Sequence, residues 1–483
     1  MTIRQTRCFP DHSGGPMAHS IWISRMGKGS IRPVSWVILL YAVALALGQD
    51  PDTEPLPLVR LMTLDPGHFH AALVHKTMYQ QVWPVVHIYA PEGPELQDHL
   101  GLMQQFNTRQ KDPTSWVLKV YTGPDYLERM LQERPGNVVV ISGNNARKTD
   151  YILACVQAGL NVLADKPMVI SPERFSMLEQ AFELAKRKGV LVYDIMTERY
   201  EIATILQNAL AQIPDVFGQL EKGTPQDPSV IMESVHHFYK SVAGSVVKRP
   251  GWFFDIRQQG EGIVDVATHL VDLVQLACFP QQVLDKGDIK IIAADRWPTE
   301  LTLDQFRQVT GLERFPEYLT SAVDGNALKV YCNGQFTYRI KDVHARITVV
   351  WNYQAPPAGG DSHASVLRGT RCSLVIRQGS AEAYQPTLYV EANRDNQIAQ
   401  ALEKAIRETL QTRYPGIDLT RLAKNRWRIE IPDKYRVGHE AHFAQVMQLY
   451  LEYLARGRIP NWETSYMLAK YYTTTEALRA ARH

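Results

Sequence analysis

The chain has 483 residues, enough for two or three domains with cores of their own. Its 45% hydrophobic and 21% charged residues are ordinary for a globular protein, and 52 Lys and Arg against 50 Asp and Glu give a formal net charge of +2. This near balance gives no sign of binding to nucleic acid or to an anionic membrane surface.

An apolar run near the N-terminus, Trp36–Leu47, has the length of a signal peptide and is too short to span a bilayer comfortably. Lys28 and Arg32 precede it, and small residues follow its end. We therefore expect residues 1–48 to be a leader and signal peptide and residues 49–57 to be a linker. The protein would then be exported, periplasmic or secreted, with no membrane contact beyond the signal; if the run is instead a buried strand, the protein is cytoplasmic.

The cysteines are spread singly along the chain, without the C-x-x-C spacing of a zinc or redox site. They are Cys8, Cys155, Cys278, Cys332 and Cys372. We interpret those after the leader as small core residues. In an exported protein Cys332 and Cys372 could still pair, and the spacing does not decide this.

Residues 58–198 alternate short apolar runs with helical stretches. After a first run at Val59, strands are expected at residues 85–90, 137–143, 161–167 and 190–196. One helix is expected from Asn145 to a stop at Gly159, and another from a Ser171 cap to Gly189. This alternation predicts a doubly wound parallel sheet.

Residues 199–483 do not continue the regular alternation of short apolar runs and helical stretches. Strand-like segments follow residue 229, and others lie near residues 345–355 and 370–379, while helices are expected at residues 395–411 and 439–457. This predicts an α+β substrate-binding domain with a large, open, mainly antiparallel sheet.

Two short motifs carry side chains suited to catalysis. Asp165 and Lys166 end an apolar strand, at the edge where doubly wound sheets bind ligands. On one helix, Asp265, His269 and Asp272 would share a face, which suits a general base with orienting carboxylates. A lysine that pairs with its neighbouring aspartate, and a buried histidine with satisfied hydrogen bonds, are the structural alternatives.

These motifs resemble those of the glucose–fructose oxidoreductase and inositol dehydrogenase family, often written Gfo/Idh/MocA. Its Glu-Lys-Pro signature has a counterpart in Asp165-Lys166-Pro167, and its Asp-x-Gly-x-His-x-x-Asp signature has one in Asp265 to Asp272. Asn145, in the segment SGNN, takes the Asn position of a third motif. The resemblance covers about residues 59–279 and continues more loosely to the C-terminus.

The resemblance implies that residues 58–198 form a Rossmann-type, dinucleotide-binding domain, and that the protein is an oxidoreductase that uses NAD or NADP and acts on a hydroxyl of a sugar, polyol or glycoside. His269 would take the hydroxyl proton, Lys166 would stabilise the alkoxide, and Asp265 would orient His269 or the substrate. Other contacts are expected from Gly67, His68, Glu92, Asn145, Asp165 and Lys166 with the cofactor, and from His237 and Asp272 with the carbohydrate. Lys240, Arg249 and Trp252 are weaker candidates for the carbohydrate, and a homo-oligomer is expected by analogy.

The phosphate-binding turn departs from the family pattern. The three glycines of G-x-G-x-x-G would fall on Asp65, Gly67 and His70, so only the second is present. Ala90 replaces the usual acidic residue after the second strand, and Glu92 is a substitute two residues later. We interpret the turn as a degenerate dinucleotide site.

A metal centre is the competing interpretation of this turn. His68-x-His70 resembles the first ligand pair of amidohydrolase barrels, and further ligands could come from His75, His236, His237 and Asp272. A barrel gives no role to the two signature motifs, so we expect no metal ligands. Two other functions remain open: redox-neutral, NAD-dependent cleavage of a glycoside on the same fold, and a non-catalytic sugar-binding relic.

Overall fold

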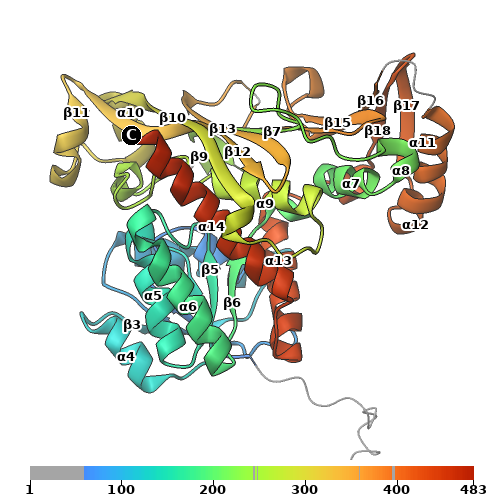
Figure 1. Ribbon diagram of the computed structural model, residues 1–483. Coiled ribbons are helices and arrows are strands. Elements are labelled where there is room, and N and C mark those ends of the chain that lie inside the picture. The colour runs from blue at the N-terminus through green and yellow to red at the C-terminus, as the bar shows by residue number, and fades with distance from the viewer. Residues whose placement is uncertain (1–58, 243–244, 247, 358, 394–397) are drawn as a thin grey trace, which may run out of the picture. The chain divides into compact units, whose positions relative to one another are not determined.

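The structure, a computed structural model, describes residues 59–483 apart from 243–244, 247, 358 and 394–397 (Figure 1). The expected signal peptide and linker lie outside these residues, as does Cys8. Within the described part of the chain, no helix combines the length and apolar character needed to cross a bilayer.

The first sheet is parallel and has six strands in the order β3-β2-β1-β4-β5-β6. Its strands are β1 (Leu61–Leu64), β2 (Val85–Tyr89), β3 (Val117–Tyr121), β4 (Val138–Ile141), β5 (Asn161–Asp165) and β6 (Val192–Ile195). Every residue of β1, β4 and β6 is buried, as expected when helices cover both faces of a sheet. The predicted doubly wound sheet is therefore confirmed.

Of the helices between these strands, the two expected from the sequence end at their predicted glycines. The helices are α2 (His70–Leu73), α3 (Pro94–Thr108), α4 (Tyr126–Glu133), α5 (Asn145–Gln157) and α6 (Phe175–Lys188). Gly159 follows α5 with φ 76° and Gly189 follows α6 with φ 68°, a left-handed conformation that glycine adopts without strain. Ser171 precedes a 3-10 turn, Pro172–Arg174, and does not cap an α-helix directly.

The second sheet has ten strands in the order β10-β12-β13-β7-β14-β15-β16-β18-β17, with the short β11 (Val323–Asp324) beside β12. Its longer strands are β7 (Val230–Tyr239), β10 (Ile289–Thr302), β12 (Ala327–Ile340), β13 (Val343–Gln354) and β14 (Ser362–Arg368), followed by β15 (Cys372–Arg377), β16 (Thr387–Ala392), β17 (Asp418–Ala423) and β18 (Arg426–Glu430). Among the described strands of this sheet, neighbours are antiparallel except for β7 and β13. The prediction of a mainly antiparallel sheet is confirmed.

The helices of this part include α7 (Ile202–Ala211), α8 (Pro214–Phe217), α9 (Ala267–Cys278), α10 (Leu303–Thr310), α13 (His439–Arg456) and α14 (Asn461–Ala481). The helix expected at residues 395–411 consists of α11 (Ala399–Ala405), a π-helical turn and α12 (Gln411–Arg413). The cysteines of the described chain are unpaired, so Cys332 and Cys372 form no disulfide here.

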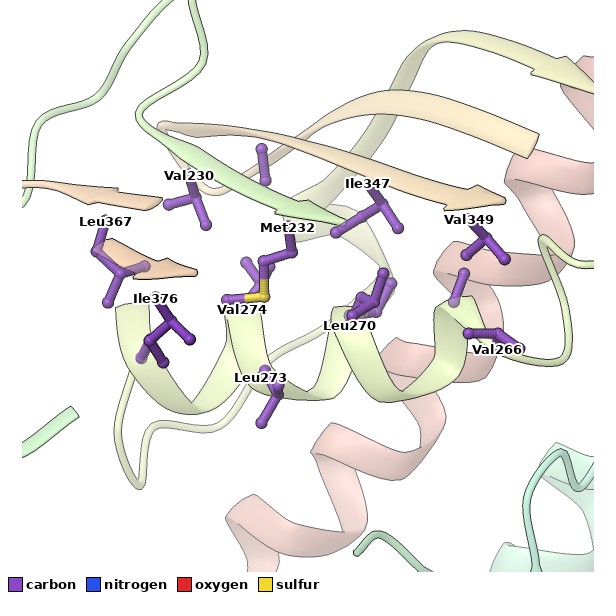
Figure 2. Close-up of a cluster of buried hydrophobic side chains, with 14 of the residues drawn as sticks. Val230, Met232, Val266, Leu270, Leu273, Val274, Ile347, Val349, Leu367 and Ile376 are labelled. Atoms are coloured by element: carbon purple, nitrogen blue, oxygen red, sulfur yellow. The ribbon is translucent and has the colours of Figure 1, made fainter. Parts of the chain in front are cut away.

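Helix α9 packs its apolar face against the second sheet (Figure 2). Leu270 and Val274, spaced one turn apart, lie against Met232 of β7 and Ile347 of β13 in a buried cluster. Burial of each such side chain contributes about 1.5–3 kcal/mol. This packing fixes α9, and therefore the direction in which His269 leaves it.

The last two helices return to the first sheet. Side chains of α13 and α14, including Met447 and Tyr471, belong to the buried cluster around β1, β4, β5 and β6. Because α14 also contacts α9 and β10, it links the first sheet to the elements that follow it in the chain (Figure 1).

A buried ionic network reinforces this junction. Lys470 of α14 is fully buried, and its Nζ lies 2.6 Å from Asp194 of β6 and 2.9 Å from Asp272 of α9. Arg199 donates to both carboxylate oxygens of Asp272, at 2.6 and 2.7 Å, and also to Glu463. Burial alone would raise the pKa of Asp272. The charge of Arg199, followed by that of Lys470, acts in the opposite direction and outweighs burial, so the pKa lies well below its ordinary value.

Replacing Lys470 by Met should destabilise the protein strongly. The change leaves Asp194 without its cation and Asp272 with one fewer, and breaking a buried ion pair on one side typically costs about 3–5 kcal/mol. Chemical denaturation would measure the free energy of unfolding. Lys404→Met is the matched control, because Lys404 is largely exposed and 3.9 Å from Glu408, so that change should cost no more than about 1 kcal/mol. Equal stability of the two variants would contradict the role of Lys470.

Candidate active site

A cavity of about 300 Å³ opens at the carboxyl ends of β1, β2 and β4, where doubly wound sheets bind ligands. Its volume is at the lower end of the range for small-molecule sites. Its lining includes Gly67, Glu92, Asn144, Arg147 and Trp252. Trp252, which the sequence suggested as a weak sugar contact, therefore lies on the cavity beside the glycine-poor turn.

The turn after β1 is held in place by the loop after β4. A Cβ atom on Gly143 would lie 2.1 Å from the carbonyl oxygen of Asp65 and 2.9 Å from the amide nitrogen of Gly67. Asp65 has φ 47°, a left-handed conformation that Asp tolerates better than most residues. Close approach of the two loops thus requires glycine at position 143, in the SGNN segment.

The Asp65 side chain stands where the family pattern has its first glycine. Tyr151 donates a hydrogen bond to Asp65 Oδ2 at 2.8 Å, and the hydroxyls of Tyr151 and Tyr126 are 2.6 Å apart. Arg147 Nη1 then donates to Tyr126 at 3.0 Å. Burial raises the pKa of Asp65, and the Tyr151 hydrogen bond opposes this shift. The carboxylate is therefore bound to α5 through a chain of hydrogen bonds that ends on a cation.

The cavity residues fit a dinucleotide. Gly67 presents backbone without a side chain, and Arg147 supplies a positive charge for phosphate. Glu92 supplies an acceptor for a ribose hydroxyl after β2. Helix α2 has only one turn, so the partial positive charge that a long helix offers to phosphate is small here. A phosphate group in this cavity would therefore have to be held mainly by backbone amides and by Arg147.

Lys166 and Asp265 form a buried ion pair next to this edge of the sheet. Lys166 Nζ donates to Asp265 Oδ1 at 2.6 Å, and Gln259 donates to the other oxygen at 2.9 Å. Burial lowers the pKa of Lys166, but Asp265 and then Asp165 raise it, so the net shift is upward. The ammonium group therefore stays protonated and can donate a hydrogen bond to a substrate oxygen.

Asn145 is placed beneath this pair. It is buried, and its amide donates to the carbonyl oxygen of Gln259 at 2.8 Å and accepts from Lys148 at 2.6 Å. In the structure it joins α5 to the loop that holds Asp265.

His269 has a different setting from the one its spacing predicts. Helix α9 begins at Ala267, so Asp265 lies in the turn before it and does not share a helical face with His269. Asp272 is 1% exposed and its carboxylate is bound by Arg199 and Lys470. Asp265 and His269 do not share a helical face because residues 262–266 form turns and not the helix that the spacing predicts.

The His269 imidazole is neutral. Burial, and then the charge of Lys166, lowers its pKa well below the ordinary 6.5. Its Nδ1 is buried and has no hydrogen-bond partner in the described part of the chain. An unpartnered ring nitrogen beside a protonated lysine can accept a hydrogen bond or a proton from a bound molecule.

His68, His70 and Asp165 meet behind the β1 turn. His70 Nδ1 is 3.0 Å and His68 Nδ1 is 3.7 Å from the same oxygen, Asp165 Oδ2, which also accepts from Ser142 at 2.9 Å. Burial, and then the neighbouring His70, lowers the pKa of His68 well below its ordinary value. Burial raises the pKa of Asp165, but the charge and hydrogen bond of His70, together with the charges of Lys148 and His68, outweigh burial and hold the pKa well below its ordinary value, so the carboxylate is charged.

A second polar cluster surrounds Asp361, just before β14. His236 Nδ1 lies 2.9 Å from one carboxylate oxygen, His237 Nδ1 lies 3.4 Å from the other, and Lys240 donates to the first. Strand alternation predicts that two adjacent histidines face opposite ways, yet both reach one carboxylate. They do so because they lie near the end of β7, where the segment carrying Asp361 crosses it.

Two further residues at the site were not identified from the sequence. Glu198 follows β6, and burial raises its pKa to about 7. Its carboxylate is 3.8 Å from Nε2 of His439, the first residue of α13, and the His439 ring lies 5.7 Å from that of His70. Nothing in the sequence indicates that α13 folds back onto the first sheet and brings His439 to His70. For Glu198, the one available signal was its position after a strand.

Two family models match the sequence. Residues 67–194 match the model described as "Oxidoreductase family, NAD-binding Rossmann fold", and residues 206–482 match "Putative oxidoreductase C terminal domain". The chain belongs to the Gfo/Idh/MocA oxidoreductase family. This confirms the resemblance that the two signature motifs indicate. No curated protein matches the sequence.

Solved structures agree with this assignment. A "putative oxidoreductase" from Parabacteroides merdae ATCC 43184 is 51% identical, with a TM-score of 0.86, covering 88% of this chain and 97% of that one. Levoglucosan dehydrogenase, in complex with NADH and L-sorbose, is 13% identical, with a TM-score of 0.55 and coverage of 88% and 97%. KijD10, a 3-ketoreductase from Actinomadura kijaniata with NADP and TDP-benzene, is 11% identical, with a TM-score of 0.51 and coverage of 87% and 97%. The last two show the shared fold alone.

This Gfo/Idh/MocA protein is therefore an oxidoreductase with an NAD-binding Rossmann domain. At its one-glycine turn, Gly143 allows the close approach of the loop after β4, and Tyr151 donates a hydrogen bond to Asp65.

Replacing Gly143 by Ala should weaken dinucleotide binding. The added Cβ would push the β1 turn away, and overpacking of this kind costs about 1–3 kcal/mol. We expect the dissociation constant for NAD(H), measured by calorimetry, to rise roughly 10-fold or more. Gly101→Ala in α3 is the control, because a Cβ there meets nothing within 4 Å. If both variants bind NAD(H) like the unaltered protein, Gly143 does not shape the site.

Proposed function

We propose that this protein oxidises a hydroxyl group of a sugar, polyol or glycoside with NAD or NADP as the acceptor. The observation that carries the proposal is the protonated Lys166, held by Asp265 and placed beside the neutral His269. Lys166 follows β5, at the edge of the parallel sheet where the cavity that fits a dinucleotide opens, while Asp265 precedes α9 and His269 lies in its first turn.

Oxidation of an alcohol breaks a C–H and an O–H bond. A dinucleotide held at Gly67, Glu92 and Arg147 would supply the hydride acceptor, and the proton would leave the oxygen for a base. Lys166 would donate a hydrogen bond to that oxygen and stabilise its developing negative charge. His269 would accept the proton, since its imidazole is neutral and its Nδ1 has no partner in the described structure. Asp265 would position Lys166.

Polar groups near this edge support a polyhydroxylated substrate. Asp361, His237 and Lys240 form one hydrogen-bonded cluster, and the charges of Lys166 and Lys240 influence each other, so the cluster is near the catalytic pair. Sugar recognition needs several such donors and acceptors in fixed positions. L-Sorbose bound to levoglucosan dehydrogenase is consistent with this class of ligand on the same fold.

Glu198 favours a second candidate function, redox-neutral cleavage of a glycoside. Such a reaction oxidises a ring carbon, eliminates the glycosidic oxygen and then reduces the carbon again. It needs an additional acid, and a carboxyl group with a pKa of about 7 is partly protonated at neutral pH. A cycle without net use of NAD would also suit an exported enzyme, and we propose export from the apolar run Trp36–Leu47.

The residues at the end of β2 favour NAD over NADP. Glu92 and Glu95 line the cavity there, and a 2′-phosphate beside carboxylates would be repelled, whereas a 2′-hydroxyl can donate to one. We expect NAD to bind about 10-fold or more tightly than NADP, and Glu92→Arg to narrow or reverse that preference. Glu128→Arg, on α4 and outside the cavity lining, should leave the ratio unchanged. Calorimetric titration of each variant with both dinucleotides tests this.

Lys166→Met and His269→Asn should each reduce turnover while the protein stays folded. Loss of one acid–base group typically costs about 10²–10⁴-fold in rate. The unaltered enzyme would first be assayed with a panel of sugars, polyols and glycosides, recording NADH formation and glycosidic cleavage in parallel. The best substrate would then be used to compare kcat/KM among the variants.

Lys186→Met and His344→Asn are matched controls, because both residues lie outside the site and should retain full rates. Net NADH formation identifies the dehydrogenase, and cleavage without net NADH identifies the redox-neutral reaction. Near-normal turnover by Lys166→Met or His269→Asn would refute the role assigned to that residue.

A further inference from the structure

His68, His70 and Asp165 form a compact set of metal-ligand side chains. Their candidate ligand atoms all lie within 4.8 Å of one another, and the two imidazole rings meet edge to face at 4.2 Å. Two segments far apart in sequence create this arrangement: the turn after β1 and the end of β5. The set is largely buried, with side-chain exposures of 18%, 10% and 5%.

A second observation is a carboxylate oxygen of Asp165 that has no hydrogen-bond partner among the described residues. Asp165 Oδ2 accepts hydrogen bonds, but the other oxygen, Oδ1, is buried and has no partner in the described part of the chain. An unsatisfied buried carboxylate oxygen costs about 1–3 kcal/mol or more. A cation bound by the carboxylate would remove that cost.

The surrounding charges leave room for a cation. Lys166 is engaged by Asp265, and Lys148 donates to Asn145 and to the backbone carbonyl of Asp165. Neither ammonium group is hydrogen-bonded to the Asp165 carboxylate. The charges of both lysines act on the Asp165 carboxylate from nearby, but its direct side-chain contacts in the described part of the chain are with His70, His68 and Ser142.

The ligand types select the class of metal. Two imidazole nitrogens and one carboxylate oxygen suit Zn²⁺ or a similar first-row divalent ion, whereas Mg²⁺ and Ca²⁺ prefer oxygen ligands throughout. Three protein ligands also leave a coordination position for water or for an oxygen of the substrate, as in catalytic zinc sites. The amidohydrolase barrel is ruled out by the doubly wound sheet, but the ligand set does not require a barrel.

We propose that His68, His70 and Asp165 bind one divalent transition-metal ion, with Zn²⁺ the best match to the ligand set. The ion would act as a Lewis acid near Lys166, the next residue after Asp165. This proposal goes beyond the oxidoreductase function and does not depend on it, because the ligands do not line the dinucleotide cavity.

The test is a Zn²⁺ titration of the full-length protein after treatment with a chelator. We expect calorimetry to find one tight site, and metal analysis after dialysis to find one equivalent of zinc. Losing a second-shell residue typically costs about 10–100-fold in metal affinity, so His70→Ala and Asp165→Asn, which remove direct ligands, should weaken binding by about 100-fold or more. His344→Ala is the matched control and should bind zinc like the unaltered protein.

Circular dichroism would establish that each variant is folded, and His68→Ala provides a third test if either of the others does not fold. Co²⁺ in place of Zn²⁺ gives an absorption signature of bound nitrogen ligands, which should disappear in the histidine variants. Absence of a tight site, or equal affinity in the ligand variants and the His344 control, would overturn the proposal. Titration with NAD⁺ in the same samples keeps the two questions separate, since loss of NAD⁺ binding alone bears only on the oxidoreductase function.

Discussion

Two buried cations, Arg199 and Lys470, hold together the elements that carry the site. Lys470 of α14 joins Asp194 of β6 to Asp272 of α9, and Arg199 joins Asp272 to Glu463. Each of these charges would be expensive to bury alone, so the elements are stable only in their common arrangement. Asp272 lies almost one turn beyond His269, and by fixing α9 it fixes the position of that imidazole against Lys166. A residue that resembles part of a catalytic motif thus acts through the helix that it anchors.

At the turn after β1, two of the three glycines of the family pattern are absent, and residues from other elements support the turn. A glycine-rich loop needs little support because nothing in it competes with phosphate, whereas Asp65 introduces a carboxylate at that point. The hydrogen bonds from Tyr151 to Asp65, and onward to Arg147, bind the carboxylate to α5 and end on a positive charge. Gly143 supplies the close backbone approach from the opposite loop. The tolerance of the turn for Asp65 therefore depends on residues more than 75 positions away, none of which belongs to the glycine pattern.

Local patterns predicted the architecture well. Buried apolar runs and the helix ends at Gly159 and Gly189 predicted the parallel sheet, and the change of sequence pattern before β7 predicted the second sheet. These signals depend only on residues that are close together in the sequence. The Lys166–Asp265 pair was accessible through the motifs that contain it. Other parts of the site depend on packing between segments that are far apart in the sequence. The spacing of apolar residues along the chain does not predict such packing. The start of α9 at Ala267 separates Asp265 from the face of His269, and the return of α13 brings His439 to His70. His236 and His237 both contact Asp361, which could not be predicted because Asp361 is more than 100 residues away in the sequence.

The end of β5 divides the site into two chemical environments. Successive side chains of an extended strand point to opposite sides, and Asp165 reaches His70 while Lys166 reaches Asp265. A cation on the Asp165 side would be repelled by the Lys166 ammonium if the two shared a low-dielectric space. The two carboxylates reduce that repulsion, because each positive charge then faces an anion of its own. With the proposed cation bound, Asp165 would balance the charge of the ion while Asp265 balances that of Lys166, and both carboxylates are buried beside the lysine.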